Sequence, residues 1–184
     1  IKCSIPTCII ITDALTHDVN ILDQIPIEPG AFYIVDRGYN DFEKLYKINN
    51  QLGFFVLRAK KNLSFNRIQS REANRLSGVV CDQIINFKGY YSHKDYPERL
   101  RRIKLYDKKQ QKSIVLLTNN LDLPPLTIGE LYKNRWKIEL FFKWIKQHLR
   151  IKSFYGTSIN AVKTQIWIAV CTYILVAILK KKLK

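Results

Sequence analysis

The stretch AFYIVDRGYNDFEKLYKINNQLGFFVLR, residues 31–58, decides the fold class of this chain. Its apolar ends, Ala31–Val35 and Phe54–Arg58, are rich in aromatic and β-branched residues and predict strands. Between them, Asn40 with Glu43 three residues later predicts a capping box that starts a helix over Asp41–Gln51. A strand, a helix and a strand in succession predict an α/β core.

The segments on either side of this core carry further predicted elements. The β-branched run Thr7–Thr12 predicts a strand, and residues 60–120 contain short apolar runs that predict an inserted antiparallel β region. Thr127 with Glu130 predicts a capping box that starts one long helix ending near Arg150. A last helix is predicted over Asn160–Lys182. The predicted domains are residues 1–59 for part of the core, 60–125 for the β-rich insertion and 126–184 for the C-terminal helices.

The charge of the chain points to a polyanionic partner. Its 184 residues include 31 Lys and Arg against 15 Asp and Glu, which gives a net charge of +16. Such an excess is typical of proteins that bind nucleic acid, although a basic soluble protein without that role has the same composition. The sequence contains no Met, so we expect a fragment of a longer protein.

Two other classes of protein are poorly supported by the residues. The four cysteines form no CxxC pair and have no zinc-type spacing to histidine, which argues against a zinc site. The apolar segment Ile166–Leu179 is shorter than a bilayer span and is followed by a Lys-rich end. We therefore expect a buried helix with a basic C-terminus, no membrane contact and a cytoplasmic protein.

The segment Tyr132–Lys146, YKNRWKIELFFKWIK, has the spacing of a chemical site. Steps of three and four residues place one set of side chains on one face of the predicted long helix. That set is Tyr132, Arg135, Glu139, Phe142 and Lys146. A carboxylate between cations and a phenol suits phosphates and a metal ion, whereas a solvated stripe with ordinary helical ion pairs is the alternative.

A second carboxylate stands at a position where α/β proteins commonly place their sites. Asp36 follows a predicted strand directly, and loops at the carboxyl ends of strands are open to ligands, although Asp is also favoured in plain turns. Asp36 and Glu139 could together ligate Mg²⁺ or Mn²⁺, which prefer oxygen. A third carboxylate is usually needed to hold a metal pair. None of the remaining candidates has the setting of a strand centre: Asp13, Asp18, Asp23 and Asp41.

The pattern Tyr132-x2-Arg135-x3-Glu139-x6-Lys146 resembles the signature of the DDE transposases of bacterial insertion sequences, in the family named for insertion sequence four. The resemblance extends over nearly the whole chain. It includes the blocks ITDALTHDVNILD, VDRGYNDFEKLY, FFVLRAKKN, LLTNNLDLPPLTIGELY, FFKWIKQHLRIKSFYGTS and NAVKTQIWIAV.

The resemblance implies a ribonuclease-H-like core, truncated at its N-terminal strands, with an inserted β-rich region and C-terminal helices. It implies that Asp36 and Glu139 are the second and third catalytic acids and metal ligands, and that Tyr132, Arg135 and Lys146 contact DNA. The implied activity is metal-dependent cleavage and strand transfer at transposon ends, with double-stranded DNA as partner and a homodimer as one option.

The first catalytic Asp of that family lies upstream of the block that this chain begins with. We therefore expect a C-terminal fragment that lacks a complete two-metal site for Mg²⁺ or Mn²⁺ and is inactive by itself. The alternative is a catalytically dead DNA-binding remnant or transposition inhibitor, and a host nuclease on the same fold is a weaker reading.

Overall fold

In the computed structural model, which describes residues 5, 6, 8–12, 18–108, 110–148 and 155–183, the chain divides into two compact units. The first, which we call the sheet unit, is Leu15–Arg135. The second, the helical unit, comprises Ile1–Ala14 and Trp136–Lys184. Each unit has hydrophobic clusters of its own.

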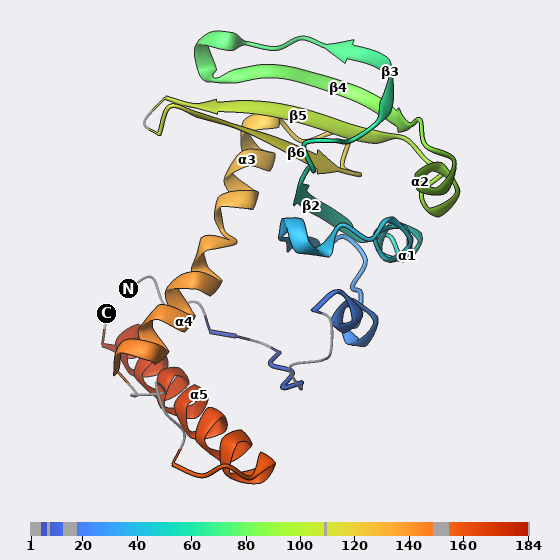
Figure 1. Ribbon diagram of the computed structural model, residues 1–184. Helices are drawn as coiled ribbons and strands as arrows, with labels where there is room; N and C mark the ends of the chain where they lie inside the picture. Colours follow the sequence, from blue (N-terminus) through green and yellow to red (C-terminus); the bar gives the residue numbers. More distant parts are fainter. Residues whose placement is uncertain (1–4, 7, 13–17, 109, 149–154, 184) are drawn as a thin grey trace. The chain divides into compact units, whose positions relative to one another are not determined.

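Six strands of the sheet unit form one mixed sheet in the order β1-β2-β6-β5-β4-β3 (Figure 1). They are β1 (Phe32–Val35), β2 (Phe54–Arg58), β3 (Phe65–Arg71), β4 (Val79–Phe87), β5 (Leu100–Asp107) and β6 (Lys112–Thr118). β1 and β2 run parallel, and the other neighbouring strands are antiparallel. Parallel strands need a crossover connection, which the intervening helix provides. The predicted α/β class is therefore confirmed.

Helices cover both faces of this sheet. The helices among the described residues of this unit are the short 3-10 helices η1 (Asp18–Gln24), η2 (Arg37–Tyr39) and η3 (Arg75–Ser77), and the α-helices α1 (Phe42–Asn50), α2 (Tyr90–Asp95) and α3 (Pro125–Lys133). Side chains alternate along β2, so Phe55 and Leu57 join the cluster with α1, while Val56 joins the cluster with α3. β2 is thus buried between α1 on one face of the sheet and α3 on the other.

The helical unit contains α4 (Trp136–His148) and α5 (Ile159–Lys182). Its cluster is built around Tyr173 of α5, whose ring centroid lies 4.8 Å from that of Phe141 and 5.1 Å from that of Trp144. Ser158 caps α5 by accepting a hydrogen bond from the Ala161 amide. The predicted last helix is therefore present within one residue of its predicted start.

Among the described residues only one stripe of α5 is buried, so the helix predicted to be buried is buried on one side only. The buried residues are Ala169, Val170, Tyr173 and Ala177, whereas Trp167 and Ile168 are exposed. By length and composition α5 is the one helix in the described ranges that could cross a bilayer. A single such helix is weak support for a membrane span, because core helices of soluble proteins meet the same criterion.

Three local predictions are wrong. Residues 8–12 contain no strand, while Thr7 lies outside the described residues. Asp41, not Asn40, caps α1, because its side chain accepts the hydrogen bond from the Lys44 amide. α3 begins at Pro125 rather than at a cap on Thr127, since proline suits the first turn, where its missing N–H costs nothing.

The predicted long helix is two helices. Asn134 and Arg135 separate α3 from α4, and their amides bond to the carbonyls of Leu131 and Tyr132, three residues back, at 3.0 and 3.1 Å. This tighter turn replaces the four-residue pattern of an α-helix. The division between the two units falls at the same place, between Arg135 and Trp136. The predicted end of the long helix, at Arg150, lies outside the described residues.

Candidate functional site

Asp36 occupies the position predicted for it, directly after Val35 at the carboxyl end of β1. Its extended backbone makes it the cap of η2, and its Oδ1 accepts a 2.7 Å hydrogen bond from the Arg37 amide. The side chain is 51% exposed, so a ligand can reach its carboxylate from the solvent.

Arg135 comes from the turn after α3 and reaches this carboxylate. Its Nη1 lies 3.3 Å from Oδ2 of Asp36, and its Cζ lies 6.0 Å from the ring centroid of Tyr132. The structure therefore brings Asp36, Tyr132 and Arg135 together at one end of β1. These are three of the residues predicted for the site.

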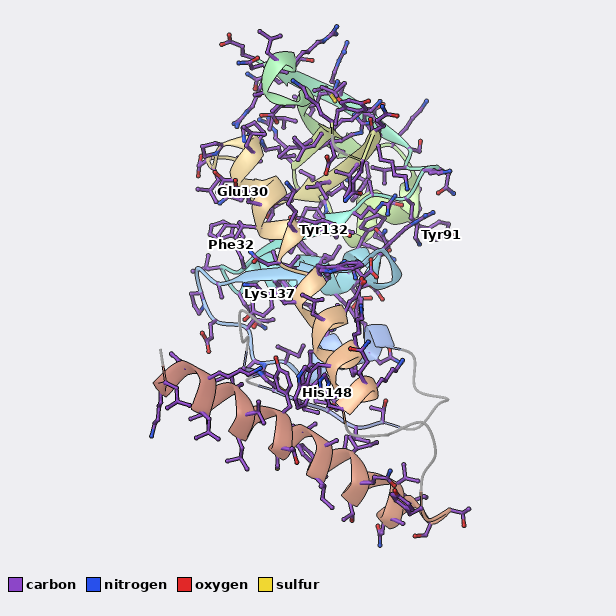
Figure 2. The ribbon with its side chains drawn as sticks, turned by 90° about the vertical axis from the view of Figure 1, so that its left-hand side faces the viewer. Phe32, Tyr91, Glu130, Tyr132, Lys137 and His148 are labelled. Carbon is purple, nitrogen blue, oxygen red and sulfur yellow. The ribbon has the colours of Figure 1, made fainter. Side chains whose placement is uncertain are left out.

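Tyr132 is buried on the inner face of α3, whereas Glu130, two residues earlier, is exposed on the same helix (Figure 2). Burial is the main cause that raises the pKa of the Tyr132 phenol. The charge of Arg135 opposes this shift, that of Asp36 adds to it, and that of Arg58 opposes it. The net effect keeps the phenol protonated, so it can donate a hydrogen bond to an anionic oxygen.

Arg58 is a site residue that the sequence reasoning missed. Val35 of β1 is in register with Leu57 of the parallel strand β2, so the next residues, Asp36 and Arg58, follow at the same sheet end. The sequence offered a partial signal, because a cation ends the strand predicted over Phe54–Arg58.

Asn40 ties this sheet end together. Its Nδ2 donates to the carbonyls of Arg37 and Arg58 at 3.4 and 3.5 Å, so it links the loop after β1 to the end of β2. Its Oδ1 is buried and has no hydrogen-bond partner among the described residues. The side chain predicted to cap a helix therefore supports the loop that carries Asp36.

The other predicted residues belong to the helical unit. Glu139 lies in the first turn of α4, where a negative charge complements the helix dipole, and it is partly buried. Lys146 is exposed in the last turn of α4, and Phe142 is 52% exposed. Because α3 and α4 are separate helices, the predicted single face of five residues is not one continuous helix face.

The donor chemistry of these carboxylates fits a hard divalent cation, but their number does not complete a site. Both oxygens of Asp36 are engaged, one by an amide and one by Arg135. Within the described ranges, no group of three or more His, Cys, Asp or Glu side chains could hold a metal ion. Asp13 lies outside those ranges.

Comparison of the sequence with known proteins identifies the family of this chain. The sequence model of the family described as transposase DDE domain matches residues 3–175. The protein y4zB of Sinorhizobium fredii, named as a transposase, is 38% identical over 177 residues, which is 94% of this chain and 49% of that protein.

Two further relatives are named for insertion sequences. A Geobacillus stearothermophilus protein, named as the transposase for insertion sequence element IS5377, is 30% identical over 94% of this chain and 45% of its own length. A Synechocystis protein, named for insertion sequence element IS4SA, is 26% identical over 79% of this chain and 40% of its own length. The chain thus spans about half the length of the curated relatives it matches.

Proposed function

This chain belongs to the transposase DDE domain family, and from that premise we propose that it forms part of an enzyme that cuts and joins DNA at the ends of an insertion sequence. The observation that carries the proposal is the family match over residues 3–175, with a strand-end carboxylate held beside Arg135 and Tyr132. Relatives named as transposases support it.

The fold that we propose for the complete catalytic domain is ribonuclease-H-like. Two features support it: the parallel pair β1 and β2 with its crossover helix, and the position of β1 at the sheet edge, where it pairs only with β2 among the described residues. A strand from elsewhere in a longer protein could add to that edge, because an unpaired strand edge presents free backbone groups. The antiparallel strands β3 to β6 would then be the insertion.

Asp36 and Glu139 are the residues that would hold the catalytic metal, together with a third carboxylate from outside this chain. Relatives of about twice the length leave room for such a residue. A bound divalent ion, Mg²⁺ or Mn²⁺, would activate the attacking oxygen and stabilise the leaving oxygen in phosphoryl transfer. Asp36 contributes a carboxylate whose orientation is already fixed by the Arg37 amide.

Tyr132, Arg135 and Lys146 would bind the DNA backbone. Arg135 carries a permanent charge beside Asp36, and its planar guanidinium is suited to a phosphate oxygen. Because its pKa is raised, the phenol of Tyr132 stays protonated and can donate a hydrogen bond to a phosphate, whereas a phenolate would repel it. Lys146 adds an exposed charge on α4. We place the enzyme in the bacterial cytoplasm, with double-stranded DNA as its substrate and a homodimer as one possible assembly.

A second candidate is a DNA-binding remnant without catalytic activity, such as a transposition inhibitor. It is favoured by the net charge of +16 together with the lack of a third metal-binding carboxylate in the described part of the chain. Such a protein would bind DNA without divalent metal and would never cut it.

A cleavage assay separates the two candidates. The full-length protein that contains this chain is incubated with a plasmid carrying the ends of its element, with Mg²⁺, with Mn²⁺ or with a chelator. A transposase nicks the plasmid at those ends only with metal, and Asp36→Asn removes the nicking while the protein still binds the DNA. Binding without nicking under every metal condition would instead support the remnant.

A further inference from the structure

Two neighbouring arginines of β5 differ in how their charge is balanced. Arg101 is buried, and its Nε and Nη2 donate to the carboxylate of Asp82 at 2.8 and 2.6 Å. Arg102 points to the opposite face of the sheet, because side chains alternate along a strand. Its Nη1 donates to neutral groups, Gln83 Oε1 at 3.0 Å and Cys81 Sγ at 3.3 Å.

Arg102 is therefore held in place without losing its charge. Its Cζ also lies 4.9 Å from the ring centroid of Phe65, so an aromatic face on β3 supports the guanidinium. The hydrogen bonds of Arg102 to other described residues start from Nη1, which leaves its Nε and Nη2 donors for a further acceptor. A positioned arginine with open donors and no carboxylate is suited to an anionic ligand.

Two more cations lie on the same face. Lys104 is two residues beyond Arg102 on β5, about 6.7 Å along the strand. Arg67 of β3 is in register with Ile85 of β4, and Ile85 is in register with Leu100 of β5. Because Leu100 is two residues before Arg102, the side chains of Arg67 and Arg102 lie on the same face of the sheet. We call Arg67, Arg102 and Lys104 the basic sheet face.

No carboxylate in the described part of the chain forms an ion pair with the basic sheet face. The ion pairs formed by the described residues involve none of its three cations. From the start of β3 through β4 to Lys104, the strands contain one carboxylate, Asp82, and it is buried on the opposite face with Arg101. Arg67 is exposed, and Arg102 and Lys104 are partly exposed.

We propose that the basic sheet face binds the phosphate backbone of double-stranded DNA, as a contact separate from the residues around Asp36. The inference rests on the proposed function, which supplies DNA as the partner. Its own support is charge complementarity: unpaired cations on a rigid sheet, one of them an arginine oriented by neutral groups, face a uniformly anionic backbone. Contacts of this kind position a protein on a duplex without reading its sequence.

The test measures duplex binding by the 184-residue chain at several salt concentrations. Fluorescence anisotropy follows a labelled DNA duplex of about 30 base pairs between about 50 and about 300 mM NaCl. The test variant is Arg102→Gln with Lys104→Gln. The matched control is Lys94→Gln with Lys163→Gln, which removes the same charge from exposed positions on α2 and α5.

We expect the test variant to bind at least about tenfold more weakly at about 100 mM salt, and its salt slope to fall by about 2 because each phosphate contact contributes about 0.9. The control keeps the wild-type slope. Arg102→Lys with Lys104→Arg, which retains both charges, keeps most of the affinity. Lys104 makes no side-chain hydrogen bond to another described residue, so the single variant Lys104→Gln should fold normally. It should lower the slope by about 1 and so separates a loss of binding from misfolding of the double variant.

Equal losses in the test and control variants would overturn the inference, because they would show a general effect of net charge. So would a loss confined to an RNA duplex of the same length. A wild-type chain that binds no duplex at low salt would contradict the proposed function as well. Wild-type binding with an unaffected test variant would contradict only the basic sheet face.

Discussion

Arg135 Nη1 and Asp36 Oδ2 lie 3.3 Å apart, although 99 residues separate them in the sequence. Asp36 directly follows the first strand of the sheet, and Arg135 follows α3, which packs on the face of the sheet opposite to α1. The contact therefore depends on the whole sheet unit being folded, with α3 seated on Val56, Ile103 and Leu116.

This pair should matter far more for DNA chemistry than for stability. The side chain of Asp36 is 51% exposed and that of Arg135 is 23% exposed. Ion pairs with that access to water stabilise a protein by about 1 kcal/mol or less. We predict that Asp36→Asn and Arg135→Gln change the free energy of unfolding by no more than about 1 kcal/mol. In the full-length protein, each should lower DNA nicking by at least about 100-fold. Urea denaturation and a plasmid assay measure the two effects, and a large loss of stability with normal nicking would contradict the assignment.

The buried pair Asp82 and Arg101 should behave in the opposite way. Arg101 also donates from Nη1 to the carbonyl of Leu123 at 2.5 Å, so the pair anchors the segment that leads into α3. We predict that Asp82→Ala lowers the free energy of unfolding by about 3–5 kcal/mol, because it leaves a buried charge unpaired. Asp82→Leu with Arg101→Met should recover most of that loss.

Urea denaturation of these variants has a control within the same unit. Asp23 forms ion pairs with Lys44 and Lys47 on the surface, and its side chain is 44% exposed. Asp23→Ala should have a much smaller effect than Asp82→Ala, and equal effects would show that burial does not decide the strength of the pair at Asp82.

Tyr96 should make the protein sensitive to alkaline pH. It is fully buried, its hydroxyl has no hydrogen-bond partner among the described residues, and burial together with the charges of Glu98 and Tyr46 raises its pKa. The folded state thus favours the neutral phenol. That contribution is complete below the unfolded pKa near 10 and is lost as the pH rises through the folded pKa.

Replacing Tyr96 by Phe tests this sign. At pH near 7 the variant should be more stable than wild type by about 1 kcal/mol, because an unsatisfied buried hydroxyl is removed. Above pH about 10 its melting temperature should fall less steeply than that of the wild type. Parallel slopes for the two proteins at alkaline pH would contradict a raised pKa for Tyr96.

The sequence predicted the sheet unit well where a strand is apolar and poorly where it is not. β1, β2 and β4 have buried apolar residues that made them visible, whereas β3, FNRIQSR, is an exposed edge strand without an apolar run and was missed. Local propensity cannot reveal a strand that is held by pairing to its neighbour.

The sequence predicted three residues that the structure brings together, Asp36, Tyr132 and Arg135, but not the arrangement of the helices that carry the predicted site. The periodicity of Tyr132, Arg135 and Glu139 implied one helix, but helical spacing continues through the tight turn at Asn134 and gives no sign of it. Contacts between distant segments, such as Arg135 with Asp36, depend on packing that no local pattern encodes. Arg58 was missed for a related reason: the register of β1 with β2 brings Arg58 to the same sheet end as Asp36, and no local sequence pattern shows that register.

The most direct measurement of the central claim is DNA cleavage by Glu139→Gln, which removes one charge from the acid proposed as a metal ligand. The matched control is Glu130→Gln, an identical change at an exposed glutamate on α3. In the full-length protein with Mg²⁺ or Mn²⁺, we predict that Glu139→Gln loses nicking at the element ends while duplex binding persists, and that Glu130→Gln nicks normally. Nicking by Glu139→Gln at the wild-type rate would contradict the account.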